Sequence, residues 1–348
     1  MCEEETILVT GGAGYIGAHV ALALIDRGAR VLVLDDLSTG HRDAVPSQAG
    51  FQQGDIADTP LVRTLIDRNG VRAVIHLAAS VSVPESAADP TKYFRNNTDG
   101  TLAFARTCVE GGVRRFIFSS TASVYGASAV SPIPETAPLA PLSAYGLSKA
   151  LAEAGLVELA GRRDGFRLAC LRYFNVQGAD GRGRAGPRNL AAGNLINLAI
   201  ETALGRRKEL DVCGRDYPTR DGTGERDYIH VSDVAAAHLA ALDRLGSEWK
   251  GGVLNIGLGR GYTVLEVVAA LQGIVGRRLP LRDAPRRPGD PASAVSDVTR
   301  LETILRWRPS HPGLEPILRS GLAWRENHAG FQRSRIASDD LRATGDSR

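Results

Sequence analysis

The chain of 348 residues is predicted to have an α/β fold, with a doubly wound parallel sheet and a smaller C-terminal α/β part. Three observations predict this fold class. Short β-branched runs alternate with longer segments whose apolar residues recur at helical spacing. A glycine-rich turn joins the first run to the first helical segment. The composition, with 43% hydrophobic and 23% charged residues, is that of an ordinary globular protein.

The strand candidates are rich in β-branched and aromatic residues. They cover residues 6–10, 30–35, 73–78, 115–120 and 167–174, with one more over 251–259. The helical segments between them cover residues 15–28, 96–112 and 143–163. Strands that alternate with helices form parallel sheets whose two faces are both covered, so the candidate strands are expected to be buried.

The character of the sequence changes after about residue 176, where a loop rich in glycine and arginine begins. We therefore expect one domain over 1–176 and a smaller, loop-rich domain over 177–328, with the segment 226–258 returning to the first domain. The polar residues 329–348 lack periodicity and are expected to form a flexible tail.

Charge and cysteine content exclude several classes of function. A formal net charge of +3 is too small to indicate a nucleic acid or an anionic membrane as partner. Cys2, Cys108, Cys170 and Cys213 are far apart and lack metal-ligand spacing, so neither a metal site nor a disulfide framework is expected. The acidic start "MCEEE" is unlike a signal peptide, and no apolar run is long enough to span a bilayer, which favours a cytoplasmic location.

A glycine pattern between the first strand candidate and the first helix indicates a dinucleotide. Gly11, Gly14 and Gly17 would allow a tight turn, close approach of backbone N–H groups to a pyrophosphate, and packing of helix on strand. The second strand candidate ends at Asp35, whose carboxylate can accept hydrogen bonds from the adenosine ribose hydroxyls. Because this carboxylate would repel a 2′-phosphate, NAD is favoured over NADP.

A second pattern indicates acid–base chemistry. Tyr145 and Lys149 are four residues apart and share one face of a predicted helix. The ammonium group and an oxidised nicotinamide would favour the phenolate, which brings a poor base into a useful pKa range. The hydroxyl groups of Ser119, Ser120 and Thr121 end the preceding strand candidate.

At these features the chain resembles the extended short-chain dehydrogenase/reductase superfamily. Further strings, among them "GGAGYIG", "LDDLSTG", "NNTDGTL", "LRYFN" and "APRRPGDPA", make it similar to the UDP-glucose 4-epimerase family. The string "DYPTRDGTGERDYIHV" is the most specific, and the resemblance covers residues 6–325. It implies an NAD-binding Rossmann domain over 1–176, a UDP-sugar-binding domain over 177–328, and a homodimer.

The resemblance also implies a set of site residues. The NAD-binding residues would be Gly11, Gly14, Tyr15, Ile16, Gly17, Asp35, Asp36, Leu37, Ser38, Thr39, Gly40, Asp55, Ile56, Leu77, Ala78, Ala79, Asn96, Ser119, Tyr145, Lys149 and Phe174. The substrate would contact Thr121, Tyr145, Asn175, Asn194, Leu195, Cys213, Arg226, Arg287, Asp290 and Ser293. The guanidinium groups of Arg226 and Arg287 suit diphosphate oxygens, although each alone is also compatible with a surface charge.

The implied reaction is 4-epimerisation of a UDP-hexose, with UDP-galactose converted to UDP-glucose. Tyr145 would take the proton of the sugar 4-hydroxyl while hydride passes from C4 to NAD, and Thr121 would bind the same oxygen. Lys149 would hold the nicotinamide ribose and lower the pKa of Tyr145. The 4-keto sugar would then turn over, and hydride would return to its opposite face.

Three departures from the family keep the substrate open. Thr121 stands where many relatives have serine, which retains the hydroxyl. Cys213 stands where an aromatic ring is usual, so the way in which uracil is held stays open. Ser293 stands where some members have a bulky tyrosine, and the space left beside the sugar C2 would admit an N-acetyl group, so UDP-N-acetylhexosamines are an alternative substrate.

Other reactions compete with this interpretation. Related dehydratases and decarboxylases carry an acidic residue after the hydroxyl, whereas this chain has Ala122 and Ser123 there. A non-catalytic NAD-sensing module is disfavoured because Tyr145 and Lys149 are both present. A 4-epimerase of a UDP-pentose or uronate, and a dehydrogenase that releases NADH, stay open.

Overall fold

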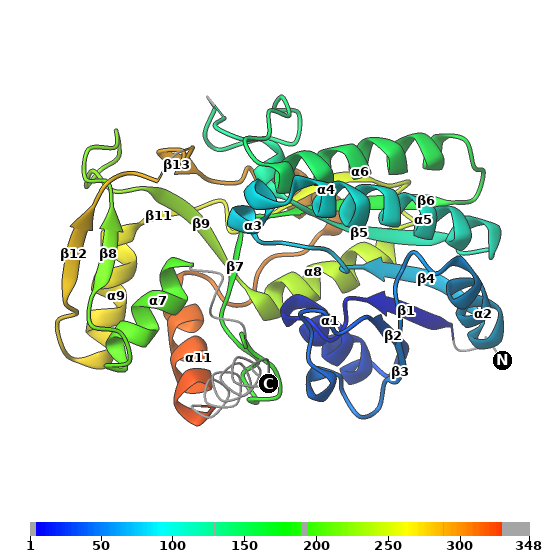
Figure 1. Ribbon diagram of the computed structural model, residues 1–348, viewed down its shortest axis with the longest axis horizontal. Coiled ribbons are helices and arrows are strands. Elements are labelled where there is room, and N and C mark those ends of the chain that lie inside the picture. The colour runs from blue at the N-terminus through cyan, green and yellow to red at the C-terminus, as the bar shows by residue number, and fades with distance from the viewer. Residues whose placement is uncertain (1–4, 129, 189–193, 288, 329–348) are drawn as a thin grey trace, which may run out of the picture.

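Seven parallel strands form the central sheet of the computed structural model, which describes residues 5–128, 130–188, 194–287 and 289–328 (Figure 1). The strand order is β10-β6-β5-β4-β1-β2-β3. The strands are β1 (Thr6–Thr10), β2 (Arg30–Asp35), β3 (Gly50–Gln53), β4 (Val71–His76), β5 (Arg115–Thr121), β6 (Arg167–Tyr173) and β10 (Gly252–Ile256). The chain winds from β1 to β3 in one direction and from β4 onward in the other, so β1 and β4 flank a topological switch point. The predicted α/β class is confirmed.

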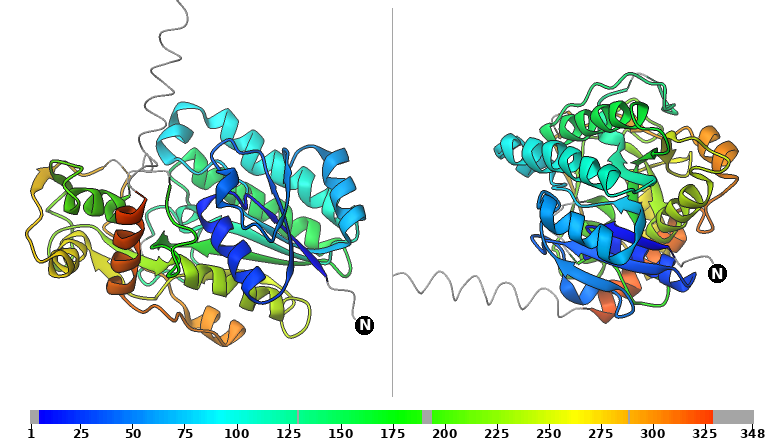
Figure 2. Two further views of the ribbon diagram at one scale, coloured as in Figure 1. Left: turned by 90° about the horizontal axis from the view of Figure 1, so that it is seen from below. Right: turned by 90° about the vertical axis from the view of Figure 1, so that its right-hand side faces the viewer.

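Helices cover both faces of this sheet, as two views at right angles show (Figure 2). One face packs on α1 (Tyr15–Asp26), α8 (Val231–Arg244) and α10 (Thr299–Leu305). The other packs on α2 (Thr59–Asn69), α5 (Thr101–Glu110) and α6 (Ala144–Gly161). Strand β1 shows why both faces of the sheet need helices. Ile7 and Val9 enter the core under α1, α8 and α10, whereas Leu8 enters the core under α2, α5 and α6. Every residue of β1 is buried, as expected for a central parallel strand.

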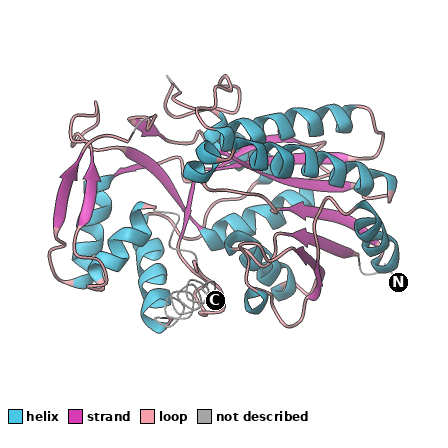
Figure 3. Cartoon of the chain, in the orientation of Figure 1, coloured by secondary structure: helices cyan, strands magenta, loops and turns pink. Residues whose placement is uncertain are grey.

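The smaller part of the molecule lies beside the sheet and holds a core of its own (Figure 3). Its four-stranded sheet consists of β7 (Asn175–Gln177), β9 (Glu225–His230), β11 (Gly261–Thr263) and β13 (Ser293–Ala294). Strands β8 (Leu210–Cys213) and β12 (Leu281–Ala284) form a parallel pair. Helices α7 (Leu195–Ala203), α9 (Val264–Val275) and α11 (Leu314–Asn327) supply most of this core. A capping box of Thr263 and Glu266 starts α9.

Some elements differ from the sequence-based expectation. The predicted strand 73–78 is β4, which ends at His76, because the next residues turn past the glycine loop of β1. The predicted helix 96–112 begins as a π-helical segment, η2 (Phe94–Gly100), before α5. The remaining helical elements of the described residues are short: α3 (Val83–Ala88), α4 (Pro90–Tyr93) and the 3₁₀ turns η1 (Arg42–Ala44) and η3 (Ala122–Val124).

Strand β10 joins the edge of the central sheet beside β6, although it follows much of the smaller part in the sequence. Helix α8, which precedes it, packs on α1. The predicted tail over 329–348 lies outside the described residues. Within the described ranges, no helix combines the length and apolar character that crossing a membrane requires.

Candidate active site

The glycine loop forms a tight turn between β1 and α1. Gly11 has a φ of +69°, and a Cβ there would lie 2.6 Å from the backbone nitrogen of Ala78. A Cβ at Gly17 would lie 2.1 Å from the carbonyl oxygen of Gly11. Gly14 caps α1 without a side-chain hydrogen bond, so no N-cap side chain occupies the first-turn amides. A loop of this form suits a pyrophosphate at a helix N-terminus.

Asp35 ends β2 beside this loop and is only 7% exposed. Its Oδ2 accepts a hydrogen bond from the backbone nitrogen of Ala13, and its Oδ1 accepts one from Leu37, each at 2.9 Å. Burial raises the pKa of this carboxyl group, and the two backbone donors oppose the increase. Each oxygen keeps lone pairs for further donors such as ribose hydroxyls.

The other predicted NAD-binding residues follow the carboxyl edge of the sheet. Asp36 accepts hydrogen bonds from Ser38 at 2.9 Å and 2.7 Å, which closes the turn that also contains Thr39 and Gly40. The remaining positions are Tyr15 and Ile16 at the start of α1, Asp55 and buried Ile56 after β3, Leu77, Ala78 and Ala79 after β4, Asn96 in η2, Ser119 in β5 and Phe174 after β6. Parallel strands bring these distant segments to one edge.

Tyr145 lies in the first turn of α6, next to the end of β5. The Ser143 side chain caps this helix by accepting a hydrogen bond from the Gly146 nitrogen at 3.1 Å. Burial raises the pKa of Tyr145, and the hydroxyl of Thr121 lowers it. Thr121 also accepts a hydrogen bond from the Ser123 nitrogen at 3.1 Å, which fixes its side chain. The structure therefore brings together the predicted hydroxyl and the predicted base.

Lys149 is buried one turn further along α6 and is 1% exposed. Its Nζ has no hydrogen-bond partner among the described residues and lies 4.5 Å from the ring centroid of Phe118. Burial lowers the pKa of Lys149 to about 7, while Glu153 raises it. A buried ammonium without acceptors costs stability unless a ligand supplies them. The site therefore fits a dinucleotide, whose ribose hydroxyls would accept the hydrogen bonds that the Lys149 ammonium group lacks.

Apart from Thr121 and Tyr145, the predicted substrate residues come from the smaller part, with Asn175 in β7, Cys213 in β8, Arg226 in β9, Ser293 in β13, Asn194 and Leu195 at the start of α7, and Arg287 and Asp290 in a loop. Arg226 forms an ion pair with Asp290, whose backbone nitrogen donates to the carbonyl of Arg287 at 3.1 Å. Asn194 caps α7 and precedes Leu195, and its Oδ1 accepts a hydrogen bond from the Asn197 nitrogen at 3.0 Å. The structure thus joins Arg226, Arg287 and Asp290 and gives Asn194 a capping contact.

Ser293 and Ala294 form β13 and project to opposite sides. The Ser293 hydroxyl donates to Glu225 at 2.7 Å and lies 3.2 Å from the Ser131 hydroxyl. Ala294 instead packs on the cluster that contains Phe174. On β13 the side chain that packs beside Phe174 is thus that of Ala294, which directly follows the predicted Ser293.

Three buried charged residues near the site are absent from the predicted set: Glu153, Arg172 and Asp227. Asp227 is fully buried and accepts hydrogen bonds from the backbone nitrogens of Leu258 at 2.8 Å and Gly259 at 3.0 Å. Its carbonyl accepts one from the predicted Asn175 at 3.1 Å. The sequence held a signal for Glu153, which stands four residues after Lys149 and shares its helix face.

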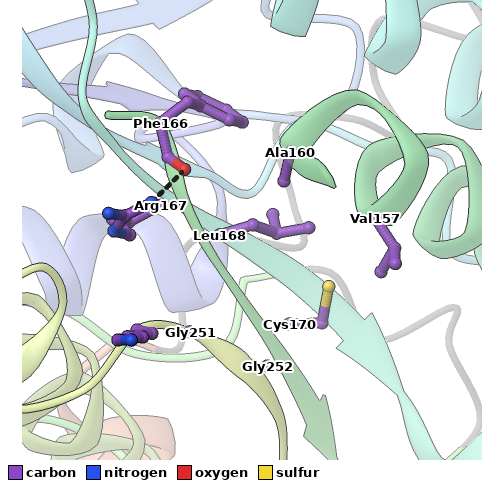
Figure 4. Close-up of a pocket in the computed structure, with 9 residues that line it drawn as sticks. Val157, Ala160, Phe166, Arg167, Leu168, Cys170, Gly251 and Gly252 are labelled. Atoms are coloured by element: carbon purple, nitrogen blue, oxygen red, sulfur yellow. Dashed lines mark hydrogen bonds between the residues drawn. The ribbon is translucent and has the colours of Figure 1, made fainter. Parts of the chain in front are cut away.

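A separate cavity of about 180 Å³ lies between the second half of α6 and the first residues of β6 and β10 (Figure 4). Its lining residues are Val157, Ala160, Phe166, Arg167, Leu168, Cys170, Lys250, Gly251 and Gly252. Leu168 and Cys170 point from β6 toward α6. None of these residues belongs to the predicted site.

Comparison with known proteins identifies the family. The model of the NAD dependent epimerase/dehydratase family matches residues 7–257. A UDP-glucose 4-epimerase of Azospirillum brasilense is 46% identical over 318 residues, which is 91% of each chain.

Two solved structures are similar over nearly the whole chain. One is a UDP-glucose-4-epimerase of Stenotrophomonas maltophila with bound NAD and formylated UDP-arabinopyranose (37% identity, TM-score 0.90, 95% of this chain and 99% of that one). The other is the UDP-Glc/GlcNAc 4-epimerase of Campylobacter jejuni (40% identity, TM-score 0.82, 93% and 99%). The chain therefore belongs to the NAD dependent epimerase/dehydratase family and, within it, to the UDP-glucose 4-epimerase family.

Proposed function

We propose that the protein is an isomerase that interconverts UDP-galactose and UDP-glucose at C4 with NAD as its cofactor. The observation that carries this proposal is that Thr121 and Tyr145 meet at the end of β5, one helix turn from the buried Lys149, whose Nζ has no hydrogen-bond partner among the described residues. The relatives reported above are epimerases of this class, which supports the same reaction.

The side chains of the site divide the work. NAD, when bound, would supply the hydride acceptor and donor for C4. Tyr145 takes the proton of the sugar 4-hydroxyl and gives it back to the 4-keto oxygen, and Thr121 donates a hydrogen bond to that oxygen. Lys149 holds a ribose hydroxyl of the cofactor and favours the phenolate of Tyr145 by its charge.

The smaller part of the molecule binds the UDP group of the substrate. Arg226 and Arg287 present guanidinium groups that suit a diphosphate, and Asp290 orients Arg226 through their ion pair. Because the sugar has to turn over between the two hydride transfers, the UDP group must be held while the sugar ring is free to rotate. Binding through the diphosphate and the base meets this condition.

An N-acetylhexosamine is the favoured second substrate class. The side chains of β13 are small, so we expect space where a larger residue would project toward the sugar, and the relative from Campylobacter jejuni is named for both glucose and N-acetylglucosamine. The formylated arabinopyranose in the relative from Stenotrophomonas maltophila keeps pentoses among the candidates. If the space is used, Ala294→Tyr should impair UDP-N-acetylgalactosamine turnover more strongly than UDP-galactose turnover, and Ser293→Tyr tests the neighbouring position.

We also infer a homodimer that forms through α6. Leu147 and Leu151 are 41% and 46% exposed, lie four residues apart and form an apolar face on this helix, hereafter the α6 apolar face. Tyr145 and Lys149 lie on the opposite side of the same helix. An exposed apolar helix face is typical of an interface between copies.

The proposed reaction is tested with purified protein and UDP-galactose, without added NAD, by chromatography of the sugar nucleotides. We expect UDP-glucose to form without net NADH, and Tyr145→Phe to abolish the conversion. Net NADH would indicate a dehydrogenase instead. If UDP-galactose, UDP-N-acetylgalactosamine, UDP-pentoses and UDP-uronates all stay unchanged with NAD added, the proposed function is wrong.

A further inference from the structure

Glu153 is a buried carboxylate to which the proposed mechanism assigns no task. It lies on α6 one turn after Lys149 and is 4% exposed. Arg172 of β6 donates from Nε to its Oε1 at 3.0 Å and from Nη2 to its Oε2 at 2.6 Å, and the Ser120 hydroxyl donates to Oε1. Desolvation of a buried ion pair costs about as much as the pair returns. Stability alone therefore does not account for this arrangement.

A chain of hydrogen bonds fixes the pair in place. Arg172 donates from Nη1 to the Tyr125 hydroxyl at 2.9 Å, and that hydroxyl donates to Oδ1 of Asn255 at 2.7 Å. The Asn255 backbone nitrogen donates to Glu135 at 2.9 Å. These residues come from β6, β10 and two loops, so the carboxylate of Glu153 is held by the scaffold before any ligand binds.

Glu153 is the anion that faces the Lys149 ammonium. Besides Glu153 and Tyr145, the titratable groups that act on Lys149 among the described residues are the Cys170 thiol on β6 and the His76 ring on β4. Burial raises the pKa of Cys170 and lowers the pKa of His76 to about 3, so both groups are uncharged at neutral pH. Arg172 is positive but is paired with Glu153. The carboxylate therefore opposes the burial that would otherwise deprotonate Lys149.

Glu153 also touches the strand that carries the predicted catalytic hydroxyl. Ser120, which donates to Glu153, directly precedes Thr121 at the end of β5. The Glu153 carboxylate thus belongs to the helix that carries Lys149 and Tyr145 and contacts the strand that carries Thr121.

We propose that Glu153 is a positioning residue of the site, which keeps Lys149 protonated and fixes the end of β5 at Thr121. This inference rests on the function proposed above. Through Lys149 it sets the pKa of Tyr145, because loss of the ammonium charge disfavours the phenolate.

The test is a pH titration of the Tyr145 phenolate absorbance in the NAD-loaded protein without substrate, with Tyr145→Phe as the blank. We expect Glu153→Gln to move the midpoint upward by about one pH unit, and kcat to fall about tenfold at pH 7 and recover at higher pH. Glu153→Asp keeps the charge and should leave the midpoint in place. Glu302→Gln, which alters an exposed partner of Arg308, is the matched control and should change neither.

A Glu153→Gln midpoint equal to that of the unmodified protein would overturn the proposal, as would a kcat lowered equally at every pH. If Glu153→Gln does not fold, Glu153→Gln combined with Arg172→Met removes both buried charges, and an upward shift is again expected, smaller because loss of the Arg172 charge partly offsets loss of the carboxylate. Ser120→Ala should lower kcat without moving the midpoint. Because the titration needs no substrate, it tests Glu153 even if every UDP-sugar stays unchanged.

Discussion

Lys149 is an ammonium group buried for function at a cost in stability. Since burial lowers its pKa from 10.5 to about 7, the folded chain binds fewer protons than the unfolded chain between these values. The contribution of Lys149 therefore destabilises the NAD-free protein progressively as the pH falls through this window. A neutral side chain of similar size would avoid that cost.

We predict that Lys149→Met lowers kcat by about 10²–10⁴-fold and yet stabilises the NAD-free protein by roughly 1–3 kcal/mol at pH 7.5. Epimerisation assays and urea unfolding between pH 7 and 10 measure the two effects. Lys92→Met, at an exposed lysine paired with Glu85, serves as the control and should leave both nearly unchanged. Equal activity of Lys149→Met and the parent would contradict the assigned role.

Asp35 is held by the loop that it is expected to serve. Asp35→Ala leaves the backbone nitrogens of Ala13 and Leu37 without their acceptor and removes the acceptor of the ribose hydroxyls. Loss of hydrogen bonds to a charged group should weaken NAD binding about 10–100-fold. Calorimetric titration with NAD measures this, with Asp67→Ala at an exposed helix position as the reference. An unchanged Kd would remove Asp35 from the cofactor site.

At the scale of elements, the glycine loop and α1 depend on a close backbone approach. Gly17→Ala would force a Cβ to 2.1 Å from the Gly11 carbonyl oxygen, so the helix must shift. We expect a loss of roughly 2–4 kcal/mol in the free energy of unfolding together with loss of bound NAD. Gly273→Ala in α9 meets no atom within 4 Å and should stabilise by about 0.5–1 kcal/mol. Thermal unfolding with and without NAD compares the pair, and similar melting temperatures would refute the packing argument.

Helix α6 shows how one element serves two surfaces. Tyr145, Lys149 and Glu153 recur at intervals of four residues and face the sheet. Leu147 and Leu151 recur at the same interval on the exposed side. The sequence periodicity predicts both faces, but it does not distinguish the side that covers the core from the side left for a partner.

At the scale of the whole molecule, the α6 apolar face bears on assembly. Leu151→Glu would place a charge in the centre of the proposed interface, and burial of an unpaired charge disfavours association. We expect this variant to elute as a monomer in size-exclusion chromatography with light scattering, whereas Leu281→Glu on β12 keeps the parental mass. A dimeric Leu151→Glu would place the interface elsewhere, and a monomeric parent would exclude the dimer.

The sequence by itself determined the α/β class, the glycine turn, the acid at the end of β2 and the tyrosine–lysine pair. Each of these rests on local spacing, which the chain records directly. The resemblance to the family implied that Arg226, Arg287 and Asp290 belong to one site, but the contact of Arg226 with Asp290 arises only when β9 and a distant loop meet. The sequence alone did not tell which residue of β13 packs beside Phe174, because a shift of one residue along a strand exchanges the two faces.

Only the tertiary structure decided which buried charged residues support the site. Glu153, Arg172 and Ser120 come from three elements, and although Glu153 shares the helix face of Lys149, the sequence does not show that its carboxylate is buried or paired with the other two. Their pairing depends on which strands become neighbours, and the addition of β10 at the sheet edge completes the network through Asn255. Groups that act together and are close in the sequence can be recognised from their spacing. Electrostatic interactions between distant residues depend instead on which strands the sheet makes neighbours.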